Sequence, residues 1–289
     1  MVKLPAALSD KLPTRISGEH SPVVTVVRLH GVIASGAVGM GRPLLNTDTV
    51  EGPLKRAFTT DGVAAVALAV NSPGGSPTQS ALIGDRIRQL AAEHPVPVIA
   101  FCEDVAASGG YWLACAADEI IATPTSLLGS VGVISAGFGL EGLIDKLGVQ
   151  RRLHTAGTNK ARLDPFSPEK DEDVAWLLGL QADIHTEFKA WVRKRRGSKL
   201  VGSDDELFTG EVWGGRRAVE LGLADSLGTL HGVLAQRYPD AEIKTTSRRK
   251  SLAARLGVPG AAHPQAPPGL MAEAMDAWER RAAWARLGI

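Results

Sequence analysis

The sequence predicts an α/β fold built on a mostly parallel sheet, and two patterns carry this prediction. Apolar runs such as 63–70 and 96–102 are typical of fully buried strands. Each run leads into a turn with two adjacent glycines and then into a helical pattern. Because buried strands alternate with helices along the chain, we expect parallel strands with helices packed on the sheet.

The first elements are justified by apolar runs and by helical spacing. The strand that begins at Val23 is β-branched and is expected to end near Gly31, and a glycine-rich loop follows it. The helix expected over 78–93 has apolar residues at helical spacing, namely Leu82, Ile83, Ile87 and Leu90. The expected elements are a strand over 23–31, a helix over 46–59 capped by Thr47 or Asp48, a strand over 63–70, a helix over 78–93, a strand over 96–102 and a helix after Ser108.

The C-terminal half is expected to hold short elements and one long helix. An apolar stripe from Trp176 to Val192 marks the long helix, which ends in the basic run 189–196. The expected elements are short strands at 119–122, 131–135 and 149–154, a short helix at 139–147, the long helix ending at Arg196, a turn at 207–210 and a helix at 213–222.

Composition is that of an ordinary globular protein. The chain has 289 residues, of which 44% are apolar and 22% charged, which suits one large domain or two small ones. The formal net charge of +1 gives no reason to expect a nucleic-acid partner. Cys102 and Cys115 lie in apolar segments, so we expect buried thiols rather than a disulfide.

The N-terminal residues mix charged side chains with short apolar patches. We therefore expect no signal peptide over 1–20. No window reaches the roughly 18 apolar residues that a membrane span needs. These features predict a protein that is cytoplasmic or peripheral to the membrane.

Ser108 stands at a strand-to-helix junction and is followed at once by Gly109 and Gly110. A serine at such a junction can project its hydroxyl from a tight turn, and the next amide points into the same space. That is the arrangement of an activated nucleophile beside an oxyanion donor. The alternative is an N-cap serine before glycines that let a helix pack closely.

A second glycine turn follows the preceding buried strand. In Asn71-Ser-Pro-Gly-Gly the adjacent Gly74 and Gly75 expose backbone amides with no side chain in the way. Two parallel strands that end in such turns can bring their amides together at one point. An acyl oxyanion could bind there.

A serine hydroxyl needs a base to act as a nucleophile at neutral pH. Among the seven histidines only His30 and His154 lie near strand ends, and a surface or capping role fits both better. A lysine could serve if its pKa fell by about 3 units from ~10.4. Residue types alone leave Lys146, Lys160 and Lys170 open.

Three motifs in order carry a resemblance to a known family. Asn71-Ser-Pro-Gly-Gly, Ala107-Ser-Gly-Gly-Tyr-Trp and Gly129-Ser-Val-Gly-Val-Ile resemble the signal peptide peptidase A family of serine-lysine peptidases, and the likeness runs from about Val23 to about Leu230. The resemblance implies the fold shared by crotonases and the caseinolytic protease, a spiral of β-β-α units with a long helical arm.

The resemblance also assigns roles to residues. Ser108 is the implied nucleophile. Lys160 is the implied general base, because a glycine precedes it and Pro-Phe follows it in the segment 155–166. Family members often carry an aromatic residue just before this lysine, where this chain has Asn159. Ser130 is the hydroxyl that would orient the lysine, and the implied oxyanion hole consists of the amides of Gly109 and of Gly74 or Gly75. No cofactor and no metal are implied.

The implied function is a serine endopeptidase that cleaves signal peptides or other extended hydrophobic peptides. The chain carries one copy of the unit, so the family pattern implies a homo-oligomeric ring or dome with active sites near subunit interfaces. There the lysine can face the serine of a neighbouring subunit. Two alternatives stay open: a crotonase-type acyl-CoA enzyme, and a non-catalytic oligomeric scaffold for membrane proteins.

The expected organisation has four parts. Composition changes after Tyr238, where a short basic run and then a stretch with four prolines follow. The terminal helix has a small, alanine-rich apolar face, which favours docking on the protein over binding to a membrane surface. The parts are an N-terminal extension (1–22), a peptidase domain (23–240), a strand and Pro/Gly-rich linker (241–269) and a C-terminal amphipathic helix (270–289).

Overall fold

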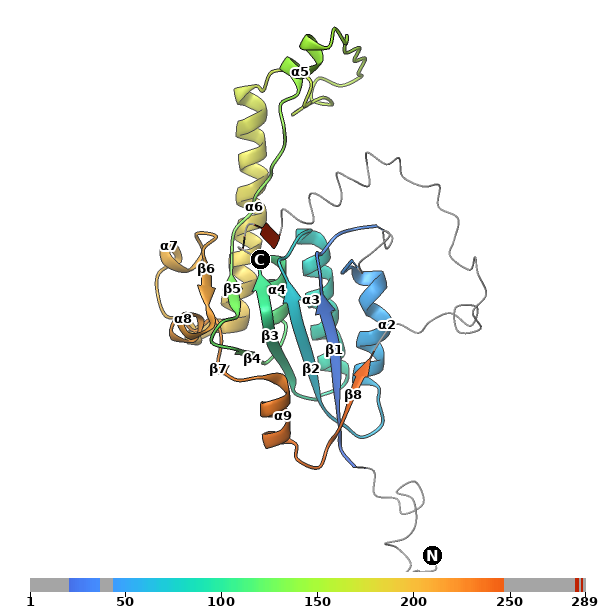
Figure 1. Ribbon diagram of the computed structural model, residues 1–289, viewed down its shortest axis with the longest axis vertical. Helices are drawn as coiled ribbons and strands as arrows, with labels where there is room; N and C mark the ends of the chain where they lie inside the picture. The colour runs from blue at the N-terminus through green and yellow to red at the C-terminus, as the bar shows by residue number, and fades with distance from the viewer. Residues whose placement is uncertain (1–20, 37–43, 247–283, 286, 288–289) are drawn as a thin grey trace, which may run out of the picture.

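The computed structural model describes residues 21–36, 44–246, 284–285 and 287, and its centre is an eight-stranded sheet (Figure 1). The hydrogen-bonded path is β6-β5-β3-β2-β1-β8, and β4 and β7 extend it beside β3. Every strand pair of this described sheet is parallel except β5 with β6. The predicted α/β class is therefore confirmed.

The elements of the first half agree with those expected. They are β1 (Val23–His30), α2 (Thr47–Phe58), β2 (Val63–Ser72), α3 (Pro77–Glu93), β3 (Val98–Ala107) and α4 (Gly109–Ala114). The predicted cap of α2 is wrong, because the N-cap is Asn46 rather than Thr47 or Asp48. The Asn46 Oδ1 accepts the Thr49 amide at 3.0 Å and the Thr49 Oγ1 accepts the Asn46 amide at 3.0 Å, which makes a capping box.

The second half contains the short elements and the long helix. They are β4 (Glu119–Ala122), β5 (Leu127–Gly129), α5 (Glu141–Lys146), α6 (Asp171–Arg196), a 3₁₀ turn (Gly197–Lys199), α7 (Asp204–Leu207), β6 (Val212–Gly214), α8 (Gly215–Glu220), β7 (Ser226–Leu227), α9 (Leu230–Arg237) and β8 (Glu242–Thr246). The strands expected at 131–135 and 149–154 are wrong, and β5 was not expected. The chain leaves the sheet after Gly129, and residues 149–154 are exposed, with none of the described strands beside them.

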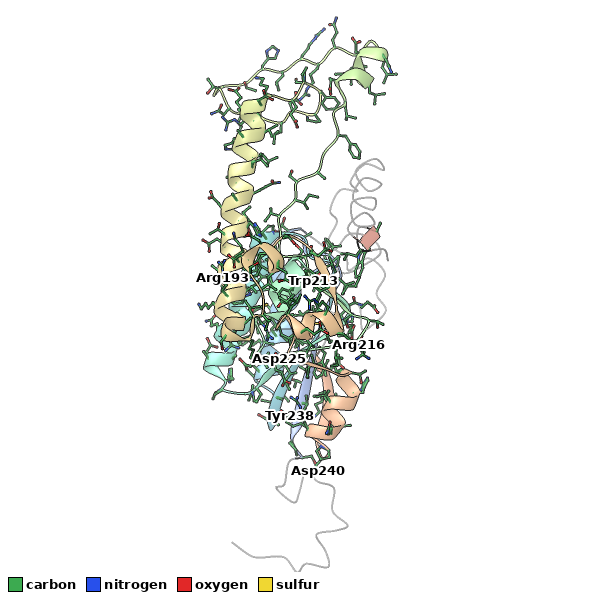
Figure 2. The ribbon with its side chains drawn as sticks, turned by 90° about the vertical axis from the view of Figure 1, so that its left-hand side faces the viewer. Arg193, Trp213, Arg216, Asp225, Tyr238 and Asp240 are labelled. Carbon is green, nitrogen blue, oxygen red and sulfur yellow. The ribbon has the colours of Figure 1, made fainter. Side chains whose placement is uncertain are left out.

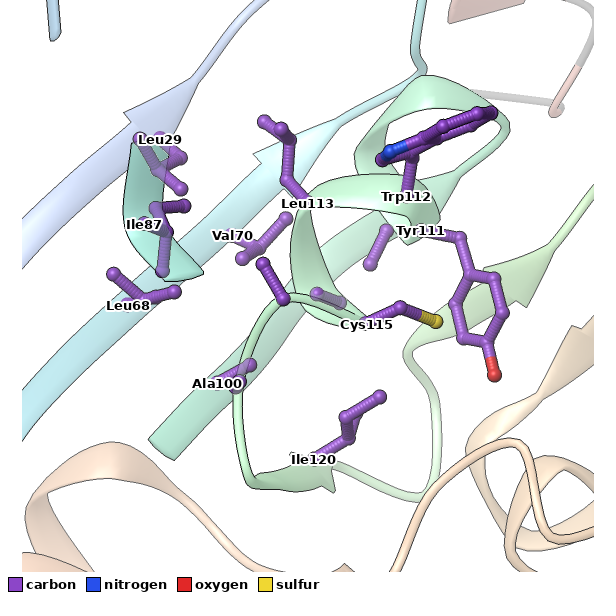
Figure 3. Close-up of a cluster of buried hydrophobic side chains, with 14 of the residues drawn as sticks. Leu29, Leu68, Val70, Ile87, Ala100, Tyr111, Trp112, Leu113, Cys115 and Ile120 are labelled. Atoms are coloured by element: carbon purple, nitrogen blue, oxygen red, sulfur yellow. The ribbon is translucent and has the colours of Figure 1, made fainter. Parts of the chain in front are cut away.

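Apolar side chains fill both faces of the sheet. On the inner face, side chains of β1, β2 and β3 pack under α2, α3 and α4 in one large cluster that includes Leu68, Ile87 and Tyr111 (Figure 3). On the outer face, Leu234 of α9 closes a smaller cluster with Val24 and other strand residues. Because the two faces alternate along each strand, the buried strands read as continuous apolar runs in the sequence.

The long helical arm is confirmed. Helix α6 has 26 residues and is about 39 Å long at 1.5 Å per residue. Its C-terminal half packs on the body, where Phe188 and Trp191 stack on Trp112 with ring centroids 4.8 and 5.9 Å apart. Its N-terminal half rises away from the sheet, together with α5 and the segment between α5 and α6 (Figure 1). These parts together are called the arm, and the rest of the described chain is called the body.

A buried ion pair joins the base of the arm to the C-terminal part of the body. The guanidinium of Arg196, 4% exposed, contacts the Asp225 carboxylate at 2.7 Å. Lys199 reaches the same carboxylate at 2.6 Å. Figure 2 labels Asp225 in the view turned by 90°. The Tyr111 hydroxyl donates to the Leu223 carbonyl at 2.8 Å, so α4 is tied to the same region.

The strand expected after residue 240 is β8, which lies parallel to β1 and forms one edge of the sheet. The expected N-terminal extension up to residue 20, the linker after Thr246 and most of the C-terminal helix lie outside the described residues. Among the helices that the structure describes, none combines the length and the apolar composition needed to cross a bilayer.

Candidate active site

Ser108 occupies the junction between β3 and α4 in a conformation that non-glycine residues seldom adopt. Its φ is +52° and its ψ is −123°. The amide of Ser108 donates to the Gly129 carbonyl at 2.8 Å, and its carbonyl accepts the Trp112 amide at 3.0 Å. These bonds on both sides fix the backbone of a half-buried serine in a strained turn, as is common at functional sites.

The Gly74-Gly75 turn touches the serine directly. A Cβ added at Gly74 would lie 2.8 Å from the Ser108 Cβ and 2.6 Å from the Gly109 amide nitrogen. A Cβ added at Gly109 would collide with the Ser80 hydroxyl. The two glycine turns predicted to converge are therefore in van der Waals contact, and each close approach requires a glycine.

The hydrogen bonds of this turn distinguish its two amides. The Gly74 amide donates to the Ser72 hydroxyl at 3.2 Å. The Ile33 amide donates to the Gly74 carbonyl at 2.8 Å, and the Ser76 amide donates to the Ile33 carbonyl at 2.7 Å, so the turn is clamped on Ile33. Within the described part of the chain, the amides of Gly75 and Gly109 have no hydrogen-bond acceptor.

Ser130 lies beside Ser108 because β5 pairs with β3. Ala107 and Gly129 are register partners, so the residues that follow them leave the sheet side by side. Ser130 also has a positive φ, of +53°, and its amide donates to the Glu211 carbonyl at 2.6 Å. The structure thus brings Ser108, Ser130 and both glycine turns together.

The segment after Ser130 is held by residues that sequence reasoning missed. The His185 Nε2 lies 3.0 Å from the Val131 carbonyl oxygen. A Cβ added at Gly129 would lie 3.0 Å from the Trp213 ring, so this indole packs on the end of β5. Trp213 is labelled in Figure 2. The Phe-Thr-Gly motif at 208–210 is the one local signal that could have pointed to this contact.

Lys160 does not join the serine within one chain. It is exposed in the segment between α5 and α6, at the far end of the arm (Figure 1). Two residues later, the Arg162 guanidinium lies 3.1 Å from the Asp173 carboxylate and 5.0 Å from the Trp176 ring centroid. Asp173 lies roughly 22 Å along α6 from Phe188, one of the two α6 residues that stack on Trp112 of α4.

The structure also locates the other lysines, histidines and cysteines that the sequence analysis considered. Lys146 and Lys170 are exposed and belong to the arm, so each lysine considered lies away from the serine. His30 lies 2.9 Å from the Glu103 carboxylate, and His154 is exposed on the arm. Cys102 and Cys115 are buried free thiols, as predicted, and burial raises the pKa of the Cys115 thiol to about 12.

Comparison with known proteins identifies relatives of this chain. A model of peptidase family S49 matches residues 91–244. Two proteins named Na(+)/H(+) antiporter NhaA, from Brucella melitensis and Brucella abortus, are 44% identical over 294 residues, which cover 99% of this chain. The match spans only 39% of each Brucella protein. Protease 4 of Salmonella typhi is 30% identical over 227 residues, or 76% of this chain and 35% of that protein.

Solved structures give a weaker likeness. A membrane protease specific for a stomatin homolog from Pyrococcus horikoshii superposes with a TM-score of 0.42 and 14% sequence identity. The superposition covers 82% of this chain and all of that one.

Proposed function

The chain belongs to peptidase family S49, and from this premise we propose that it is a serine endopeptidase with Ser108 as nucleophile and Lys160 of a neighbouring copy as general base. Membership in a peptidase family favours peptide hydrolysis over acyl-CoA chemistry on the same fold. The antiporter name of the Brucella relatives belongs to proteins more than twice as long as the matched region, so it is not carried over.

One observation carries the nucleophile assignment. Ser108 has a strained backbone and lies where the two glycine turns meet, and the Gly74 backbone contacts its Cβ. An N-cap serine would instead accept a hydrogen bond from the first turn of its helix, and Ser108 makes no such side-chain bond. The conformation therefore supports a hydroxyl held for chemistry rather than for capping.

The oxyanion hole of the proposed site consists of the amides of Gly109 and Gly75. The two amides stand on touching turns and have no acceptor within the described residues. The Gly74 amide is already bound to Ser72, so Gly74 contributes by its shape instead. Removing one fixed backbone donor of this kind typically lowers the turnover rate by a factor of about 10²–10³.

The base must come from another copy. Lysine is a base only when neutral, and burial is what lowers a lysine pKa toward neutrality. Lys160 is exposed on an arm that holds it far from its own serine. An assembly in which the arm of one copy lies over the body of the next would bury the amine and place it beside Ser108 and Ser130 together.

The arm carries the surface such an assembly needs. Nine apolar side chains of the arm and of the stretch that leads to it from Val131 have 42–72% of their area exposed. Exposed apolar patches of this kind mark sites of protein association. The residues are Ile134, Phe138, Leu143, Leu147, Val149, Leu153, Trp176, Leu178 and Leu180. We therefore propose a ring or dome in which neighbouring arms and bodies contact one another.

The proposed reaction has two halves. Neutral Lys160 accepts the Ser108 proton while Oγ bonds to the peptide carbonyl carbon, and the Gly75 and Gly109 amides bind the oxyanion. The C–N bond then breaks, and the lysine ammonium gives its proton to the leaving amine. Water attacks the resulting ester, and Lys160 takes a proton from the water and returns it to Ser108 as the acid product leaves.

The proposed substrate is an extended peptide with apolar side chains. Beyond Val131 the chain runs without regular structure from the site toward α5. In Figure 1 this green stretch connects the body to the top of the arm. Among the described residues, the backbone from Val133 to Gly137 has no hydrogen-bond partner on a neighbouring strand. A substrate strand could pair with it. Signal peptides and similar hydrophobic segments fit this surface.

A fluorophosphonate probe tests the proposal in the assembled protein. The expected result is one labelled residue, Ser108, with no labelling of Ser108→Ala. Ser203→Ala changes an exposed serine before α7 and should label like the wild type. Labelling of a different residue, or none in an assembled and folded protein, would leave the non-catalytic scaffold as the better description.

A further inference from the structure

The outer face of the sheet, opposite α2 and α3, is only half covered. Helix α9 packs over its lower half, where Leu234 is fully buried. The upper half holds a cavity of about 830 Å³. Its floor consists of Val26, Ala69 and Phe101, and its walls include Thr125, Leu127 and Ile243. The floor is apolar and the rim carries polar side chains such as Arg28 and Thr229, a combination that is typical of a binding site.

One side chain from the C-terminal end of the chain already lines this cavity. Trp284 is half-buried there, although the last strand of the sheet ends at Thr246. Figure 1 shows the short dark-red fragment that contains Trp284 near the upper ends of β2 and β3. Tryptophan suits such a site, because it combines a large apolar ring with one polar N–H at its edge.

Carboxylates outnumber guanidinium groups in the lining of the cavity. Glu103 and Asp104 line it together with Arg28, and Glu103 also lies 2.9 Å from His30. The sequence places Arg280, Arg281 and Arg286 within a few residues of the tryptophan. Opposite charges at the edge of an apolar contact fix its register and disfavour wrong partners.

We propose that this cavity is the docking site of the chain's own C-terminal segment, with the Trp284 indole as its anchor. The strand β8 supplies Ile243 and Thr245 to the wall, so the chain that continues from Thr246 starts at the cavity itself. A tethered segment has an effective concentration in the millimolar range, so a weak contact is enough to keep it bound. The entropic cost of closing the loop between Thr246 and Trp284 grows only slowly with the length of the loop.

The docked segment covers the sheet without blocking the proposed site. Asp104 and Leu127 line the cavity, and they belong to the strands that end just before Ser108 and Ser130. Neither serine lines the cavity, and neither do Gly74, Gly75 and Gly109. The contact is thus a cover for an apolar face next to the site, rather than an inhibitor of the serine.

Cross-linking in the full chain tests the docking without any measurement of peptidase activity. Ala285→Cys is paired with Thr245→Cys, since Thr245 lines the cavity and both positions are exposed, whereas Cys102 and Cys115 are buried. A short bis-maleimide should give an intrachain cross-link. Adding Trp284→Ala to this pair should slow cross-linking at least roughly tenfold, the effect of losing about 1.4 kcal/mol of contact.

The matched control pairs Ala285→Cys with Thr59→Cys, at the exposed C-terminal end of α2 on the opposite face. This pair should cross-link slowly, with or without Trp284. Equal rates for the two pairs, or a rate that ignores Trp284→Ala in a variant with unchanged melting temperature, would overturn the proposal. Cross-links formed only between chains would overturn it too, because the occupant would then be a second copy.

Discussion

The amide of Ser108 donates to the carbonyl of Gly129 at 2.8 Å, and this bond joins the turn of one serine to the strand end that precedes the other. Ser108 and Ser130 follow register partners on β3 and β5, and both have positive φ values. The proposed nucleophile and its neighbouring hydroxyl therefore depend on strand pairing, whereas the proposed base depends on the arm.

Gly74→Ala should lower turnover about 10²–10³-fold while the protein stays folded. The new methyl group would meet the Gly109 amide and the Ser108 side chain at 2.6 and 2.8 Å, and alanine disfavours the φ of +96°. Displacing one oxyanion donor costs about 10²–10³ in kcat. Peptide hydrolysis and circular dichroism measure the two effects. Gly179→Ala, in the middle of α6 with open space around it, should keep full activity.

Mixing two inactive variants should restore activity. Ser108→Ala lacks the nucleophile and Lys160→Ala lacks the base, so each assembly alone should be silent. In a randomly mixed assembly, about a quarter of the sites should combine an intact serine from one copy with an intact lysine from the next. Turnover after subunit exchange is the measurement. Silence of the mixture, with exchange shown by mass, would refute a base supplied by a neighbour.

Much of the body was predictable because its signals are local. The runs before Gly74 and Ser108 are buried on both faces, so they stand out as apolar segments that end in glycine. The strand β5 has only three residues. It pairs with β3 on one side and with β6, which includes Trp213 from far along the chain, on the other, and no local pattern reveals this. The segment 149–154 has a strand-like composition, but no strand in the described part of the chain lies next to it, so the composition gave a wrong prediction.

Phe188→Ala should destabilise the protein strongly, because Phe188 fixes the arm to the body. Its ring is 4% exposed and stacks on Trp112. Loss of a buried phenylalanine costs about 3–5 kcal/mol in the free energy of unfolding. Chemical denaturation measures this change. Val201→Ala removes a side chain that is 58% exposed outside the proposed association surface and should change stability by less than about 0.5 kcal/mol.

Acid should weaken the protein through Asp225. Burial alone would raise its pKa, but hydrogen bonds from Arg196 and Lys199 outweigh burial and hold the pKa below its ordinary value. A carboxyl group with a lowered folded-state pKa contributes stability above its unfolded pKa of ~3.9 and loses it as the pH falls toward the folded value. The free energy of unfolding should therefore drop below about pH 4–5.

Asp225→Ala should remove that part of the acid dependence and lower stability at neutral pH. The Arg196 guanidinium would stay buried without its partner, which costs about 3–5 kcal/mol. Urea denaturation at a series of pH values measures both effects. Glu220→Ala breaks an exposed pair with Arg217 and should leave the pH profile unchanged. A wild-type pH profile in Asp225→Ala would show that other carboxylates set the acid limit.

Asp173→Ala should reduce turnover without unfolding the protein, because Asp173 orients the segment that carries Lys160. Its carboxylate pairs with Arg162, two residues from the lysine, and also accepts the Leu163 amide at 3.4 Å. Displacing a reacting group by about 1 Å can cost 10²-fold in rate. We therefore expect a fall in kcat with little change in KM, melting temperature or assembly mass.

The matched control is Asp183→Ala, which removes an exposed acid from the same helix and should be neutral. Asp173→Glu keeps a carboxylate near Arg162 and should recover part of the lost kcat, which a purely structural role at this distance from the core would not produce. If Asp173→Ala turns over substrate as fast as the wild type, the arm tip does not position the base. The lysine would then have to be sought elsewhere on the arm, at Lys146 or Lys170.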